Sequence, residues 1–280
     1  MDRIITRERI PSRDPRLGRH VNHDSMSRLF PYRAKQRTLR SVLHEAHMPI
    51  LDQGSLGSCT GHAGVGCLGR GGFFTTVNDA DRYQLDSAGA VALYSRATQI
   101  DPFAGEYPPT DTGSDGLSVA KALHEVGEIA GYLWTFTLKD ALDALQDQPL
   151  ITGTVWRSDM FSPDPGGVVK PAGSVVGGHE YVADEYQAER GLVGFTNSWG
   201  LGWGARGRFY MAAEDWGTLL DQQGDVTVFV PATDLSPEPA EQDPDEVFAD
   251  VLRPWVARPR GCNRKVRAAG RTWLAAKGLM

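Results

Sequence analysis

The sequence has few cysteines and no long apolar run, and both absences narrow what the protein can be. Its three cysteines, Cys59, Cys67 and Cys262, are too few for a disulfide framework, and their odd number would leave one of them unpaired. The fold must therefore hold without such bridges, as in reducing compartments. No segment approaches the roughly 20 consecutive apolar residues of a membrane span, and the first residues lead into no apolar signal segment. We therefore expect neither a membrane partner nor export by the ordinary signal route.

Charge is balanced over the whole chain but is unevenly distributed along it. The formal net charge of −6 is ordinary for 280 residues and favours no class of partner by itself. Residues 236–250 are acidic and rich in proline, whereas residues 251–280 contain eight Lys or Arg and no Asp or Glu. The composition predicts an N-terminal arm over 1–47, a main domain over 48–232, a linker over 233–250 and a basic tail over 251–280.

The basic tail leaves several roles open. Val266, Ala269, Trp273 and Leu274 lie at roughly helical spacing and predict a short amphipathic helix. Positive charge favours phosphate contacts, but no nucleic-acid motif accompanies it, so we do not expect a nucleic-acid partner. The tail could be a solvated extension, a docking element for a protein partner, or a segment that folds back onto the main domain.

The main domain changes from helical to strand patterns along its length, which predicts an α+β fold. The arm, rich in Arg and His, shows no periodicity, and we expect it to extend over the surface without regular elements. Residues 101–115, rich in Pro, Gly and Asp, predict a long loop beside a site. The expected helices cover residues 59–68, 87–99, 117–126 and 139–146, and the expected strands cover 150–156, 180–185, 191–197, 207–212 and 225–231.

A glycine-rich turn, Gln53-Gly-Ser-Leu-Gly-Ser-Cys59, places one cysteine at the start of a predicted helix. A lone cysteine is usually a small buried hydrophobe. At a helix N-terminus, however, the partial positive charge lowers the thiol pKa and favours the reactive thiolate. The backbone amide of Cys59 is also free to bind an oxyanion there, and Gln53 can supply a second donor. This pattern is typical of a nucleophile.

Two later motifs supply the partners of such a nucleophile. His179 follows two glycines, Gly177 and Gly178, and Asn197 opens an Asn-Ser-Trp-Gly run eighteen residues further on. An imidazole can take the thiol proton and return it to a leaving amine, while a side-chain amide fixes the ring orientation. We therefore predict a catalytic set of Cys59, His179 and Asn197, with Gln53 as oxyanion donor.

These three blocks resemble the signature blocks of papain-like cysteine peptidases, over about residues 49–230. His179 follows Cys59 by 120 positions and Asn197 follows it by 138, near the family's separations of about 130 to 150. The resemblance implies a helical lobe and a β lobe, with the substrate in the cleft between them. It implies that Trp199 shields the histidine–asparagine bond and that Trp199, Gly113, Ser114 and Gly178 line the substrate site.

The sequence departs from plant and lysosomal members of that family. Thr60 stands where an aromatic residue normally follows the cysteine, and the disulfides are absent. The segment before Met48 is too short and irregular to resemble their long helical propeptide. The resemblance fits bacterial or viral intracellular relatives better, so we expect a cytoplasmic or virion-associated protein.

Other interpretations stay open. His62, three residues after Cys59, could compete as a base, although a packing or polar-network role is the simpler one. Cys67 and Cys262 have no His or second Cys at metal-ligand spacing, so we expect no metal and no cofactor. The expected function is a peptidase that acts on protein or peptide substrates. One alternative is a catalytically silent module of a larger assembly, attached through its arm or tail. The other is a cysteine-dependent cell-wall amidase.

Overall fold

The computed structural model describes residues 6–24, 29–35, 37–76, 83–232, 269 and 272–277. The chain divides into two compact units, Met1–Asp234 and Leu235–Met280. In the second unit, residues 272–276 are helical and Leu274 is buried. The predicted linker over 233–250, most of the basic tail and Cys262 lie outside the described residues. The following paragraphs concern the first unit.

Six α-helices are described in the first unit, and side-chain caps define the start of three of them. Asp86 and Asp115 accept hydrogen bonds from backbone N–H groups three residues on, each at 2.8 Å, and Thr137 caps α5 in the same way. No helix of the described residues is long and apolar enough to cross a membrane. The helices are α1 (Cys59–Leu68), α2 (Gly71–Thr76), α3 (Ser87–Ile100), α4 (Gly116–Glu125), α5 (Leu138–Leu145) and α6 (Ala213–Asp221), with a 3-10 turn η2 at Ser158–Phe161.

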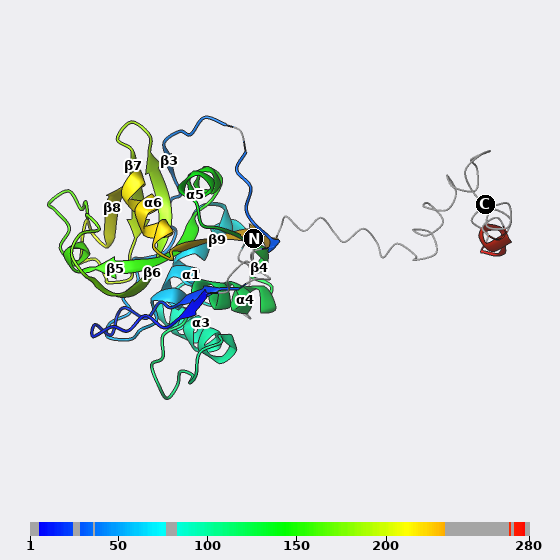
Figure 1. Ribbon diagram of the computed structural model, residues 1–280, viewed down its shortest axis with the longest axis horizontal. Coiled ribbons are helices and arrows are strands. Elements are labelled where there is room, and N and C mark those ends of the chain that lie inside the picture. The colour runs from blue at the N-terminus through cyan, green and yellow to red at the C-terminus, as the bar shows by residue number, and fades with distance from the viewer. Residues whose placement is uncertain are drawn as a thin grey trace. The chain divides into compact units, whose positions relative to one another are not determined.

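The strands of the second half form one antiparallel sheet in the order β4-β9-β5-β6-β7-β8. The longest, β6 (Val175–Gln187), pairs with β5 (Leu150–Arg157), β7 (Leu192–Thr196) and the short β3 (Val42–Leu43). The others are β4 (Ile129–Thr135), β8 (Arg208–Ala212) and β9 (Asp225–Pro231). This sheet, with helices on it, confirms the predicted α+β class (Figure 1).

Two apolar cores lie in the unit, and each belongs to a different set of helices. One core joins α1, α3 and α4 to the sheet through Ile151, Val182 and Phe229. The other joins α5 and α6 to the opposite side chains of the strands, with Trp156 and Trp216 fully buried in it. Because β6 contributes to both cores, residues along it can face either set of helices.

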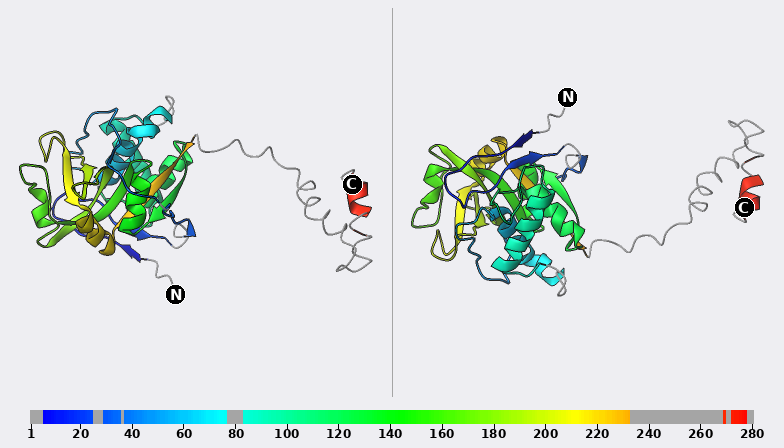
Figure 2. Two further views of the ribbon diagram at one scale, coloured as in Figure 1. Left: turned by 90° about the horizontal axis from the view of Figure 1, so that it is seen from above. Right: turned by 90° about the horizontal axis from the view of Figure 1, so that it is seen from below.

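The N-terminal arm is part of the fold, so the expectation of an extended surface segment without elements was wrong. β1 (Thr6–Glu8) pairs with β2 (Val21–His23), and both lie along one side of the unit in the two views of Figure 2. Leu17, Arg19 and Val21 are buried. Their partners lie far along the chain, and local composition therefore could not reveal them.

Candidate active site

Cys59 is the first residue of α1 and is fully buried. The whole helix is buried because its small residues let neighbours approach closely. A Cβ built on Gly61 would lie 2.7 Å from the backbone nitrogen of Tyr94 in α3, and one on Gly64 would lie 2.6 Å from Val119 in α4. The glycines thus allow α1 to pack against α3 and α4, which fixes where its N-terminus and Cys59 stand.

His179 and Asn197, predicted from separate motifs, meet in the structure. His179 lies on β6 and Asn197 directly follows β7, and Nε2 of the ring is 2.7 Å from Oδ1 of the amide. The same Oδ1 accepts a hydrogen bond from the Ser198 N–H at 2.8 Å. An amide oxygen only accepts, so the ring carries its proton on Nε2. Among the described residues, no group hydrogen-bonds the buried Nδ1, which leaves it able to accept a proton.

Two indoles enclose the imidazole. The Trp199 ring lies 4.7 Å from the His179 ring between centroids, and the Trp156 ring lies 5.0 Å away, edge to face. Trp199 is itself 7% exposed. These rings keep water away from the histidine–asparagine hydrogen bond, which strengthens it. The Trp199 indole therefore lies directly against the imidazole.

Gln53 is held with its amide nitrogen directed at a carbonyl group. Its Oε1 accepts a hydrogen bond from Ser198 Oγ at 2.7 Å, and its Nε2 donates to the Arg16 carbonyl at 3.1 Å and to the Leu56 carbonyl at 2.6 Å. Ser198 was not predicted as a site residue, although its place in the Asn-Ser-Trp-Gly run was a usable signal. Gln53 Nε2 thus already donates to two carbonyl oxygens in this structure, one of them from the N-terminal segment.

Burial sets the protonation of the pair, against the expected thiolate. Desolvation raises the pKa of the Cys59 thiol to about 12, although backbone amides of Glu180, Gly18 and Thr60 act to lower it. Desolvation also lowers the pKa of His179 to about 4, against the opposing effect of Asn197. The helix N-terminus does not overcome this burial. Thiol and imidazole are therefore both neutral here at pH 7.

The N-terminal segment itself covers the site. The Arg19 N–H donates to the Gly178 carbonyl at 3.1 Å, and the Ser114 N–H donates to the Gly18 carbonyl at 2.9 Å. The His20 N–H donates to the Ser114 carbonyl at 2.8 Å, which makes the pairing of Arg19 with Ser114 parallel. The guanidinium carbon of Arg16 lies 4.4 Å from the Trp199 ring centroid. We call residues 16–20 the covering segment.

The residues predicted to bind substrate therefore contact the chain's own backbone. Gly178 and Ser114 hydrogen-bond the covering segment, and Gly113 has φ near +70° with the Gly18 carbonyl so close that a Cβ would overlap it. These three positions come together with Cys59 around one stretch of peptide. The covering segment itself was missed, because Arg and His in an aperiodic stretch indicate exposed chain.

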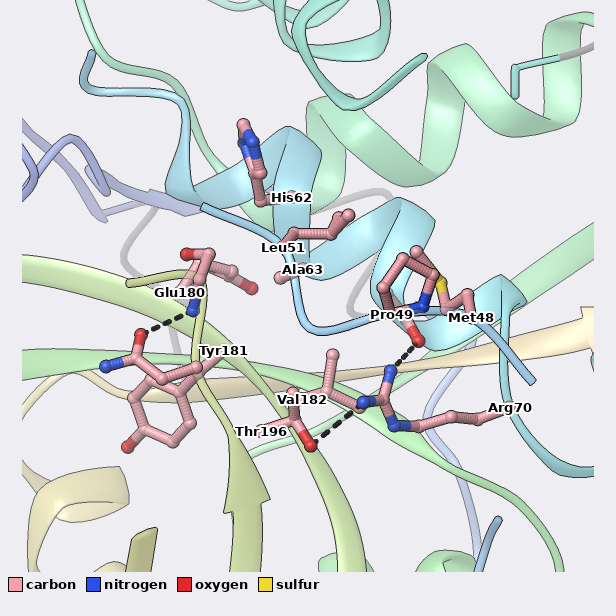
Figure 3. A pocket seen from close by; sticks show the side chains of 13 residues that line it. Met48, Pro49, Leu51, His62, Ala63, Arg70, Glu180, Tyr181, Val182 and Thr196 are labelled. Carbon is pink, nitrogen blue, oxygen red and sulfur yellow. Dashed lines mark hydrogen bonds between the residues drawn. The ribbon is translucent and has the colours of Figure 1, made fainter. Parts of the chain in front are cut away.

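His62 and Cys67 take structural positions. The Nδ1 of His62 lies 3.1 Å from Ser58 Oγ and 3.0 Å from the Ser58 carbonyl, within its own helix. Figure 3 shows His62 projecting from α1 away from the strand that carries Glu180, beside a cavity of about 10 Å³. Cys67 is buried and its thiol donates to the Pro149 carbonyl at 3.5 Å. Within the described ranges no cluster of three His, Cys, Asp or Glu could hold a metal ion.

The backbone is similar to those of known cysteine proteases. Xylellain, a cysteine protease from Xylella fastidiosa, has a TM-score of 0.63 and 15% identity, over 79% of this chain and 97% of that chain. Digestive procathepsin L 3 of Tenebrio molitor larval midgut has a TM-score of 0.53 and 13% identity, over 79% and 76%. The ragweed pollen allergen Amb a 11, a cysteine protease in its proform, has 0.51 and 16%, over 75% and 72%.

No family model matches the chain, and no curated protein sequence does. At 13–16% identity the likeness concerns the fold alone. It confirms the predicted two-lobed papain-like fold, with α1 as the central helix of the helical lobe.

Proposed function

We propose that the protein is a cysteine peptidase that cleaves peptide bonds through Cys59, His179 and Asn197. The observation that carries the proposal is the 2.7 Å contact between His179 Nε2 and Asn197 Oδ1, with Nδ1 left without a partner among the described residues. We propose that the Cys59 thiol transfers its proton to that nitrogen and attacks a carbonyl carbon. The imidazolium then protonates the leaving amine, and water releases the acyl-enzyme.

Gln53 and the Cys59 N–H are the proposed oxyanion donors. Ser198 Oγ donates a hydrogen bond to Gln53 Oε1, so the Gln53 Nε2 is already oriented before a substrate binds. Preorganised donors of this kind stabilise the charge that develops on the carbonyl oxygen. The Arg16 carbonyl at 3.1 Å stands in for that oxygen. Trp199 is proposed to protect the histidine–asparagine bond rather than to select a substrate.

The test is covalent labelling followed by hydrolysis. An epoxide that alkylates papain-like thiols should modify Cys59, as located by mass spectrometry, in a Gly18→Ala chain whose covering segment is displaced. In that chain, cleavage of labelled casein should exceed any release from labelled peptidoglycan. Cys59→Ala should abolish both, and Asn197→Ala should lower the casein rate roughly 10²-fold by misorienting His179. Cys67→Ala is the matched control and should keep full labelling. Casein cleavage unchanged in Cys59→Ala would refute the proposal.

A second candidate, the catalytically silent module, is favoured by one observation. Cys59 is fully buried beneath the covering segment, and its thiol is neutral at pH 7. A silent module would keep this arrangement permanently. A peptidase must expose Cys59 when the covering segment moves, so the two candidates differ in what happens when that segment is displaced. An assembly partner bound through the basic tail remains a proposal of its own.

A further inference from the structure

Arg19 is fully buried although it belongs to the N-terminal segment. Its backbone N–H binds the carbonyl of Gly178, the residue before His179, and its neighbours pair with Ser114. The side chain of Arg19 is thus anchored beside the candidate active site and enters the protein from there. An arginine is almost never fully buried without a carboxylate partner, so the groups around its guanidinium define a built site.

The Arg19 guanidinium lies among two carboxylates and two glycines. One terminal nitrogen forms an ion pair with Asp225 and donates to the Gln223 carbonyl at 2.9 Å, and Nε lies 4.0 Å from Glu180 Oε2. A Cβ built on Gly153 would lie 2.5 Å from Arg19 Nε, and one on Gly116 would lie 2.5 Å from Glu180 Oε1. The two glycines therefore keep open the space that the guanidinium occupies.

This cluster is not satisfied as a structural ion pair would be. Both carboxylate oxygens of Glu180 are buried and have no hydrogen-bond partner among the described residues, and neither do Nε and Nη1 of Arg19. Buried polar groups in a stable core are nearly always paired. Glu180 belongs to β6 and borders the cavity of about 10 Å³ (Figure 3). Glu180 therefore keeps two acceptor oxygens that Arg19 does not fill.

The charges of the site suit one positive occupant. Burial acts to raise the pKa of Asp225, but Arg19 and His23 outweigh it and hold that pKa below its usual value. Burial raises the pKa of Glu180, and the Asp225 charge raises it further. One carboxylate charge therefore balances one guanidinium, and without an occupant the buried Asp225 carboxylate would keep only the His23 ring, whose Nε2 lies 3.3 Å away.

We propose that Glu180, Asp225, Gly116 and Gly153 form the substrate-selecting site of the enzyme, which takes an arginine side chain of the peptide substrate and is occupied here by Arg19. This rests on the proposed function. Arginine is preferred to lysine because the bound guanidinium faces Asp225 with one end and Glu180 with Nε. A single ammonium group cannot serve both positions.

The experiment uses the full chain with Arg19→Ala, which empties the site. Three quenched peptides differ only at one position, which carries arginine, lysine or citrulline, the neutral isostere of arginine. We expect kcat/KM for the arginine peptide to exceed that for the citrulline peptide roughly tenfold or more, because a charge-assisted hydrogen bond is lost in citrulline. Adding Asp225→Asn should bring the ratio close to one. Adding Asp221→Asn, which removes an exposed charge on α6, should leave the ratio unchanged.

A second readout does not need turnover. Arginine peptide amides should protect Cys59 from the epoxide at lower concentrations than citrulline amides do. If Arg19→Ala does not fold, Gly18→Ala, which cannot keep the covering segment in place, is used for both measurements. Cleavage or protection without an arginine preference overturns this inference alone. Failure of both variants to react at Cys59 or to cleave any peptide overturns the proposed function, and this inference with it.

Discussion

Gly18 is the residue at which the covering segment can be tested with least chemical change. A Cβ built there would overlap the carbonyl of Gly57, and it would meet backbone atoms rather than a flexible side chain. Even alanine therefore forces the covering segment or the turn before Cys59 to shift. The Gly18 amide, which acts on the Cys59 thiol, would shift with it.

We predict that Gly18→Ala increases the rate of Cys59 alkylation by the epoxide roughly tenfold or more at pH 7. A thiol released from burial returns toward its ordinary pKa of about 8.5, and its thiolate fraction rises accordingly. Gly131→Ala is the matched control, because a Cβ there has no neighbour within 4 Å. Equal alkylation rates in Gly18→Ala and the unaltered chain would favour the silent module.

At the scale of elements, a buried charge network ties the end of α1 to the sheet. Asp184 on β6 binds Arg70, just beyond α1, at 2.7 Å and Arg208 on β8 at 2.8 Å. Thr196 on β7 donates to the same carboxylate at 2.7 Å. Asp184 and Arg70 are almost fully inaccessible, so the ion pair is screened little by water. The network sets the position of α1 relative to the strands that carry His179 and Asn197.

We predict that Asp184→Asn lowers the free energy of unfolding by about 3–5 kcal/mol, because it leaves the buried Arg70 guanidinium without its carboxylate. The urea midpoint of the full chain measures the change. Glu125→Gln, which breaks an exposed ion pair with Arg96, is the control and should leave the midpoint unchanged. A loss no larger than in the control would mean that the network does not hold α1 in place.

The elements that local pattern could identify were predicted well. The helix over 59–68 has the predicted bounds, and those expected at 87–99, 117–126 and 139–146 lie within one residue of α3, α4 and α5. Caps and 3.6-residue periodicity are local signals. The helices α2 and α6 and the strand β4 were not predicted, because their positions depend on the neighbours against which they pack.

The residues of the candidate site likewise include some that local motifs predicted and one, Arg19, that they did not. Cys59, His179 and Asn197 stand in motifs short enough to recognise one by one, and the fold brings His179 and Asn197 into contact. Arg19 gave no such signal, because its partner Asp225 lies 206 positions away. The polar composition of the arm predicted that Arg19 would be exposed to solvent. In the structure it is buried against charges supplied by β6 and the start of β9. Only the complete sheet assembles those charges.

At the scale of the whole unit, burial of neutral thiols couples stability to pH. Desolvation raises the pKa of Cys59 to about 12, and it raises that of Cys67 further. An unfolded thiol titrates near 8.5. Since the folded pKa lies above the unfolded one, the stabilisation is complete below about pH 8.5 and is lost as pH rises toward the folded value.

We therefore predict that the free energy of unfolding falls by about 2.5 kcal/mol from pH 9 to pH 10, with about 1.2 kcal/mol from each thiol. Urea titrations of the full chain at both pH values measure the slope. Cys67→Ala and Cys59→Ala should each halve it. Gly18→Ala should remove the contribution of Cys59 to this slope, because a thiol exposed to water has the same pKa in the folded and unfolded states. A slope that Cys59→Ala leaves unchanged would show that the covering segment does not keep the thiol from water, and the argument for an occluded site would fail.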